Sequence, residues 1–211
     1  MSVDEPLLDH LVYAAIDPAA TVDRFASALG VTPAEGGRHL GRGTRNYLLG
    51  LTDSAYLEII GLDVEHPADP GAQVPFGVDQ VTEDGLLTFA IHPADIDAAV
   101  STSSTHGADH GPAAAMSRRT ATGDLISWRI ASAVPLPYDG LAPFVIDWGS
   151  TPHPALSGLP RVELASFSVT TPDPQPVRAL YGALGLAVSV STAPRSSLSA
   201  VVIGPGGTLT L

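Results

Sequence analysis

The stretch LDHLVYAAI (residues 8–16), followed by Asp17-Pro18 and a helical segment that ends at Gly30, decides how this chain folds. Its first part is an apolar, partly β-branched run of strand length, which predicts a β-strand. An aspartate followed by proline is typical of a helix N-terminus, because the carboxylate caps the first turn and the missing proline N–H costs nothing there. Gly30 suits a left-handed C-cap. The stretch therefore predicts a strand followed at once by an α-helix.

The same pattern occurs three times along the chain. The second copy begins with LLTFAI (residues 86–91) and continues with a helix from Asp95. The third begins with VELASFSV (residues 162–169), continues with Asp173-Pro174 and ends its helix at Gly185. Further strand-like runs follow each helix, at residues 44–51, 55–61, 125–131, 198–203 and 208–211. A repeat of this kind indicates one supersecondary unit used several times, here strand, helix and two or three further strands.

The repeat predicts an α+β fold made of βαβββ modules. We expect residues 1–134 to form one domain that contains two modules, residues 8–62 and 86–132. A proline-rich connector at residues 135–160 should then lead to a third, C-terminal module at residues 161–211.

Composition excludes several classes of function. The chain has no cysteine, and all ten of its basic residues are arginines, so thiolate metal sites, disulfides and lysine Schiff bases are excluded. A net charge of −12 argues against a nucleic-acid partner. The glycine-rich residues 36–43 precede a strand and not a helix, so we expect neither a nucleotide nor a flavin. No apolar run is long enough for a membrane helix, and the acidic N-terminus lacks signal-peptide character, so we expect a cytoplasmic location.

Several segments carry a resemblance to a known superfamily: DHLVYA (9–14), GRHLGRGTRN (37–46), YLEIIG (56–61) and DWGSTPHP (147–154). With the repeated βαβββ unit they resemble the vicinal-oxygen-chelate superfamily, in its glyoxalase-like branch (the glyoxalase/bleomycin-resistance/dioxygenase-like fold). The resemblance covers nearly the whole chain. It implies that paired modules curl their mixed sheets around a cleft, and that a divalent metal is held there by residues of the first and last strand of each module. His10 and Glu58 would be the ligands of the first module.

The second and third modules depart from that pattern. Counted back from the helix-capping aspartates, the positions that correspond to His10 are Thr88 and Ser166. Counted from the turn aspartate, the position that corresponds to Glu58 is Arg129, which cannot ligate a metal. A third protein ligand would then come from His39, His92 or His153. We expect His153, because it lies in the DWGSTPHP segment; the sequence does not distinguish zinc, nickel, manganese, iron and magnesium.

A second interpretation of these residues needs no metal. His10 could be a hydrogen-bonded strand histidine, and Glu58 could form an ion pair with Arg129 across the cleft, where such a pair would attract strongly away from water. Both interpretations hold together if Glu58 binds the metal while Arg129 binds an anionic substrate.

Other residues are expected to contact the substrate. Thr44 and Asn46 share one strand face and would neighbour His10 and Glu58. Arg42 lies in the glycine-rich segment, which we expect to be a mobile loop at the cleft mouth. Trp148 would line the pocket, and Arg129 would neutralise a substrate carboxylate.

These expectations lead to two functional hypotheses. The first is a small-molecule enzyme of the lyase or isomerase class, in which a divalent metal acts as a Lewis acid on a carbonyl or enediolate oxygen and Glu58 and Arg129 are catalytic. The alternative is a metal-free protein of the same fold that binds or sequesters a small molecule. In both hypotheses the expected partner is a small molecule, and an anionic one if Arg129 binds its carboxylate. We also expect a homodimer, because three modules leave one unpaired.

Overall fold

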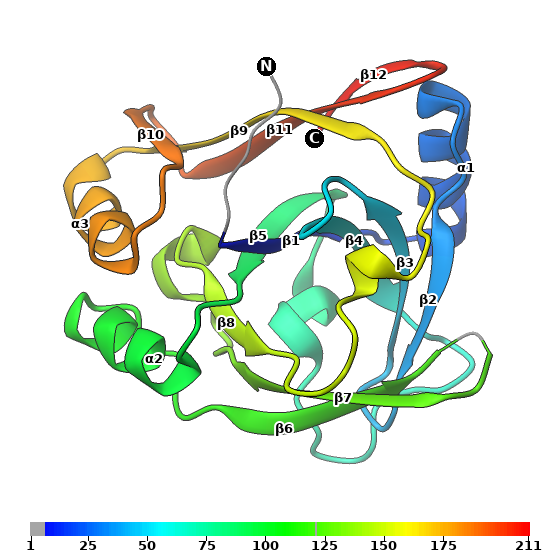
Figure 1. Ribbon diagram of the computed structural model, residues 1–211, viewed down its shortest axis with the longest axis horizontal. Coiled ribbons are helices and arrows are strands. Elements are labelled where there is room, and N and C mark those ends of the chain that lie inside the picture. Colours follow the sequence, from blue (N-terminus) through cyan, green and yellow to red (C-terminus); the bar gives the residue numbers. More distant parts are fainter. Residues whose placement is uncertain (1–6, 121) are drawn as a thin grey trace.

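The computed structural model describes residues 7–120 and 122–211 and contains a closed barrel beside a second, smaller sheet (Figure 1). The order of strands around the barrel is β1-β4-β3-β2-β6-β7-β8-β5. Its strands are β1 (Leu8–Ala14), β2 (Ala34–His39), β3 (Thr44–Gly50), β4 (Tyr56–Leu62), β5 (Gly85–Ile91), β6 (Ala114–Arg119), β7 (Leu125–Ala131) and β8 (Phe144–Asp147). The helices are α1 (Pro18–Leu29), α2 (Ile96–Thr105) and α3 (Pro174–Leu184), with short 3-10 helices η1 (Pro75–Gln80), η2 (Pro137–Gly140) and η3 (Pro154–Leu156).

The barrel consists of two halves with the same strand pairing. In the first half β1 pairs in parallel with β4, and in the second half β5 pairs in parallel with β8. The halves join through the antiparallel pair β1 and β5 on one side, and through β2 and β6 on the other. This arrangement of curled mixed sheets confirms the predicted α+β fold class.

The helix signals in the sequence act as predicted. The side chain of Asp17 accepts a hydrogen bond from the amide of Ala20 at the start of α1, and Gly30 ends that helix with a φ of 69°. Asp173 and Gly185 do the same for α3, where the φ of the glycine is 77°. Local capping chemistry therefore sets where these helices begin and end.

Two segments differ from the sequence-based expectation. Strand β8 lies inside the segment that we expected to be a connector, where it completes the barrel by pairing with β5 and β7. The first half of the glycine-rich segment is not a loop, because residues 36–39 belong to strand β2 and pair with β3, whereas residues 40–43 form the turn between the two strands. A glycine-containing strand has weak propensity of its own, so its neighbours in the barrel determine its conformation.

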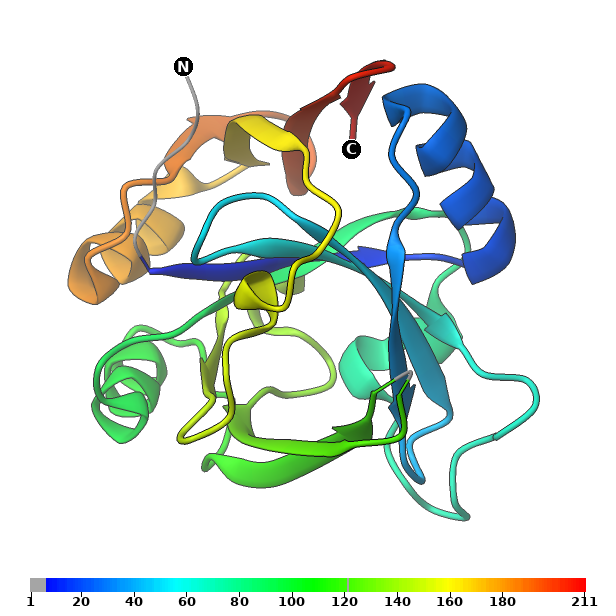
Figure 2. The same cartoon turned by 45° about the vertical axis from the view of Figure 1, so that its right-hand side comes forward.

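The third unit has the expected element order but pairs its strands differently. It comprises β9 (Glu163–Thr171), α3, β10 (Ser189–Thr192), β11 (Ser197–Gly204) and β12 (Gly207–Thr210). Its first strand, β9, lies between β10 and β11 instead of pairing with the last strand. Figure 2 shows this sheet lying along the outside of the barrel over β1 and β5. The ring of Phe89 on β5 contacts Phe167 and Tyr181 across this junction.

Strand alternation separates two apolar clusters. On β1, Leu11 and Tyr13 face outward into the core shared with the helices and the third sheet. Val12 faces inward and packs with Phe76, Trp128 and Phe144 inside the barrel. Among the described residues, no helix has the length and apolar character needed to cross a membrane.

Candidate functional site

The barrel interior contains a cavity with a polar side and an apolar side. The room open to a water molecule inside it is about 20 Å³, enough for one water or one ion. Residues of both halves line it: His10, His39, Asn46, Tyr56, Glu58, Pro75, Phe76, Met116, Arg118, Trp128, Ile130, Phe144, Ile146 and Trp148. The sequence-predicted residues His10 and Glu58 therefore face the same space.

The register of the parallel pair β1 and β4 brings His10 and Glu58 together. Tyr56 is the partner of His10 and Glu58 is the partner of Val12, so both side chains point inward from adjacent strands. Nε2 of His10 lies 3.6 Å from Oε2 of Glu58. The amide of Asn46 on β3 donates a hydrogen bond of 2.5 Å to Oε1 of the same carboxylate. Each of these side chains is buried.

His39 approaches the Glu58 carboxylate from strand β2, which is separated from β4 by β3. Its Nε2 lies 4.0 Å from Oε1 of Glu58, and its Nδ1 contacts the hydroxyl of Thr44 at 2.9 Å. The pKa of His39 is lowered to about 4, chiefly because the ring is buried; Glu58 opposes this change, and the nearby Arg118 and His10 add to it. His39 is therefore neutral at neutral pH, with a ring nitrogen directed at the cavity.

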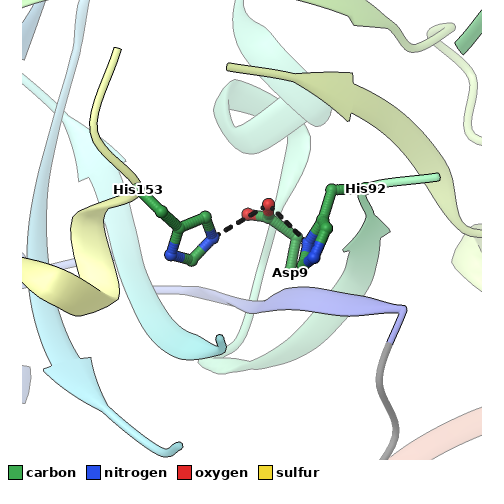
Figure 3. Close-up of side chains that lie close together, drawn as sticks. All are labelled: Asp9, His92 and His153. Carbon is green, nitrogen blue, oxygen red and sulfur yellow. Dashed lines mark hydrogen bonds and ion pairs between the residues drawn. The ribbon is translucent and has the colours of Figure 1, made fainter. Parts of the chain in front are cut away.

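Asp9 is a buried carboxylate that contacts the ring nitrogen of His10 opposite the one that faces Glu58. One of its oxygens contacts Nδ1 of His10 at 2.6 Å, and the other accepts a hydrogen bond of 2.9 Å from the Trp148 indole. Figure 3 shows Asp9 between His92 and His153, whose nitrogens lie 3.1 and 3.0 Å from the second oxygen. Burial alone would raise the pKa of Asp9, but hydrogen bonds from His10, His153 and His92, in that order of effect, hold the pKa well below its ordinary value. Asp9 is therefore an anion.

This contact fixes the orientation of the His10 ring. An imidazole that donates its Nδ1 proton to Asp9 presents the lone pair of Nε2 to the cavity and to Glu58. The arrangement resembles the outer carboxylate that orients histidine ligands in metal sites.

The group of Asp9, His92 and His153 also brings three potential ligand atoms within 4.8 Å of one another. However, Nδ1 of His153 accepts a hydrogen bond of 3.1 Å from the amide of Ala155. A neutral His153 then carries its proton on Nε2 and donates it to Asp9. In this arrangement the group acts as a hydrogen-bonded clamp on Asp9.

Arg118 places a positive charge on the cavity wall. It extends inward from β6, is 5 % exposed, and donates a hydrogen bond to the carbonyl of Gly36 on β2. Burial lowers the pKa of Arg118, against the opposing effect of Tyr56 and Glu58. A guanidinium does not lose its proton in proteins, so Arg118 stays a cation.

Comparison with known proteins identifies the family. A family model described as a Glyoxalase-like domain matches residues 8–185, which is most of the chain. This chain belongs to the Glyoxalase-like domain family. The predicted resemblance to glyoxalase-like proteins is thereby confirmed. No curated protein matches the chain.

The solved structures that resemble this glyoxalase-like protein are distant from it in sequence. A hypothetical protein from Staphylococcus aureus is 15% identical, with 96% of this chain and 97% of that chain covered and a TM-score of 0.63. Methylmalonyl-CoA epimerase from Mycobacterium tuberculosis is 18% identical over 67% of this chain and 86% of that chain, with a TM-score of 0.39. A mutant 4-hydroxymandelate synthase from Streptomyces coelicolor is 14% identical, with 100% of this chain and 63% of that chain covered and a TM-score of 0.48.

Arg129 does not reach the cavity of the glyoxalase-like barrel. It lies on the outer face of β7, where it donates a hydrogen bond of 2.8 Å to Asp97. The expected ion pair between Glu58 and Arg129 is absent, since the partner of Glu58 is Asn46. The prediction for Arg129 was wrong because it overlooked β8. Counting residues from the turn aspartate matched Arg129 on β7 with Glu58 on β4, whereas the strand of the second half that is equivalent to β4 is β8. On β7 the inward residue is Trp128.

The other predicted residues lie at varied distances from the centre of the site. Asn46 contacts Glu58 directly, and Thr44 contacts His39. Trp148 lines the cavity, while His153 reaches Asp9 and not the pair of His10 and Glu58. Arg42 lines a neighbouring outer depression together with Val74, Pro75 and Phe76.

Two residues of this site could not be assigned to it from the sequence. Asp9 directly precedes His10 on β1, so strand alternation predicts that its side chain points away from the cavity. The register shift between Leu8 and His10 nevertheless allows Asp9 to contact the histidine. Arg118 shares one face of β6 with the apolar Met116, two residues earlier, and this pattern would have predicted an inward guanidinium once the strand bounds were known.

Proposed function

We propose that the protein is a small-molecule enzyme of the lyase or isomerase class, with its site around His10 and Glu58 inside the barrel. The observation that supports this most is the 3.6 Å separation between Nε2 of His10 and Oε2 of Glu58. It is too long for a hydrogen bond. With Asp9 holding the other nitrogen, two electron-rich atoms face each other in a buried space, and they attract only if a cation or an acidic proton lies between them.

The donor types of the site suit a divalent metal of the first transition row, but the ligand atoms of His10, His39 and Glu58 do not all lie within 4.8 Å of one another, so His39 would have to move inward to join the other two. His10, His39 and Glu58 offer two imidazoles and one carboxylate, a combination that such metals accept, and Asp9 supplies the outer carboxylate that orients one imidazole. When bound, the metal would supply Lewis-acid polarisation of a carbonyl or enediolate oxygen. All three candidate ligands come from the first half of the barrel, because the inward residues of β5 and β8 include Thr88, Ala90, Phe144 and Ile146.

The chain's own residues provide the remaining chemistry. Glu58 is the one carboxylate among the residues that line the cavity, so we assign to it the proton transfer that lyases and isomerases require. Asn46 fixes one of its oxygens and leaves the other facing His10. On the apolar side of the cavity, the rings of Phe76 and Phe144 pack against each other with their centroids 4.8 Å apart, and they limit the access of water.

One observation favours the alternative, a binding protein without turnover. The second half contributes no carboxylate and no imidazole to the cavity wall, only apolar groups and Arg118. Such a half-polar cavity suits retention of a small molecule as well as catalysis.

Metal analysis separates the two functions. The full chain, purified without chelator, is incubated with zinc, nickel, manganese, iron or magnesium, and bound metal is measured by mass spectrometry. We expect His10→Ala and Glu58→Gln each to lower the affinity at least tenfold. His106→Ala, at the end of α2, is the matched control and should bind like the wild type. Metal content unchanged in both site variants contradicts the proposal, and saturable ligand binding without metal favours the alternative.

A further inference from the structure

Arg118 is a buried cation that lacks an anionic partner in the described part of the chain. Its only hydrogen bond there goes to the Gly36 carbonyl, and no carboxylate oxygen lies within the 4.0 Å of an ion pair. Buried arginines are rarely left without a counter-charge, because the transfer of an unpaired charge from water is costly. The remaining guanidinium N–H groups face the cavity that also contains Glu58 and Tyr56.

The barrel makes room for this side chain at a specific place. A Cβ on Gly36 would collide with the side chain of Asn46, and one on Gly37 would collide with the carbonyl of Arg119. Gly36 thus leaves room for the Asn46 side chain, and Gly37 allows the backbone of β6 to approach β2 closely and leaves room for the Arg118 guanidinium beside it. The position of Arg118 is therefore built into the packing of the barrel, unlike that of a surface arginine.

The interior adjoins a larger hollow through which a ligand could enter. An outer depression with about 210 Å³ of room shares Pro75, Phe76, Met116 and Ile130 with the cavity. Phe76 has a φ of 57°, a left-handed conformation that a bulky residue seldom adopts and that is found mostly at functional sites. A ligand with a small charged head at Arg118 would extend past Phe76 into this depression.

We propose that Arg118 binds the carboxylate of a small organic acid, which makes small carboxylates the ligand class of the barrel interior; this rests on the proposed function of the same cavity. A planar guanidinium binds a carboxylate through two parallel hydrogen bonds, and the limited interior room suits a flat head group. The carboxylate would supply the counter-charge that the chain itself does not provide.

Tryptophan fluorescence gives a direct test, because Trp128 and Trp148 are the only tryptophans and both line the cavity. The full chain is titrated with acetate, glyoxylate, pyruvate and lactate, with the neutral amides of the same acids, and with inorganic phosphate. We expect a saturable change with at least one acid and a much weaker one with its amide. Arg118→Met should weaken binding of that acid at least tenfold, the effect of losing a charged hydrogen bond. Arg129→Met, which removes an arginine from the outer face, should leave it unchanged.

The outcomes separate this proposal from the metal proposal. Acid binding that survives chelation and Glu58→Gln, but not Arg118→Met, supports the carboxylate site even if no metal is held. Several results overturn it: equal binding of acid and amide, indifference to Arg118→Met, preference for phosphate, or no response to any acid. If Arg118→Met does not fold, Arg118→Lys serves instead, since it keeps the charge and loses the paired hydrogen bonds, and wild-type affinity in that variant also overturns the proposal.

Discussion

The two halves of the barrel share one topology but differ in what they present to its interior. The first half, β1 to β4, turns inward His10, His39, Asn46 and Glu58. The second half, β5 to β8, turns inward mainly apolar residues together with one charge, which are Met116, Arg118, Trp128, Ile130, Phe144 and Ile146. A repeated fold therefore does not imply a repeated site. The first half supplies the candidate metal ligands, and the second half supplies the apolar wall of the cavity and one cation, Arg118.

The difference also divides the energetics. In the first half several buried polar groups pair with each other, as Asn46 does with Glu58 and His39 with Thr44, although Oδ1 of Asn46 has no partner. In the second half burial of apolar surface is the main stabilising term. Substitutions in the second half should therefore act on stability through packing, whereas substitutions in the first half should act through lost hydrogen bonds.

The largest effect is expected at Phe144. Its ring is fully buried on β8 and packs against Phe76. It also meets the His10 ring edge to face, with the two ring centroids 5.3 Å apart. Phe144→Ala should lower the free energy of unfolding by about 3–5 kcal/mol, because it removes apolar contact and leaves a cavity. Urea unfolding measures this. Phe144→Leu keeps most of the volume and should cost less than half as much, and a loss below about 1 kcal/mol for alanine would show that this half does not hold the barrel together.

An intermediate effect is expected at Asn46. Its amide is the hydrogen-bond donor to Oε1 of Glu58, so Asn46→Ala leaves a buried carboxylate without that partner. The expected loss in unfolding free energy is about 1–3 kcal/mol. Gln73→Ala removes a longer amide contact at the surface and should change the same quantity by less than about 0.5 kcal/mol. Similar losses in the two variants would mean that Glu58 does not depend on Asn46.

How much of this follows from sequence depends on how local the signal is. The β1–α1 unit was predictable because Asp17, Pro18 and Gly30 act within one turn of the helix. Strand β8 was not, since four residues in a proline-rich segment acquire their strand pairing only from β5 and β7. That missing strand shifted the count along the second module.

The candidate site shows the same division. The resemblance pointed to His10 and Glu58, and the structure places both in one cavity; their roles as ligands stay predictions. Arg129 was the wrong arginine for a cavity wall, because face alternation requires knowing the strand register. The role of His153 could not be predicted, because its contact with Asp9 joins residues 144 positions apart. The homodimer also stays a prediction.

The smallest effect, and one of opposite sign, is expected at Thr88. Its hydroxyl is buried on β5 without a hydrogen-bond partner, whereas the hydroxyl of Thr44 in the first half contacts His39. Thr88→Val should therefore raise the free energy of unfolding, by up to about 1 kcal/mol, while Thr44→Val should lower it. Urea unfolding of the two variants compares the same chemical change in each half. If Thr88→Val destabilises the protein as much as Thr44→Val does, the Thr88 hydroxyl has a partner in solution. The second half would then take part in polar contacts of the interior, and the contrast between the halves would be one of degree.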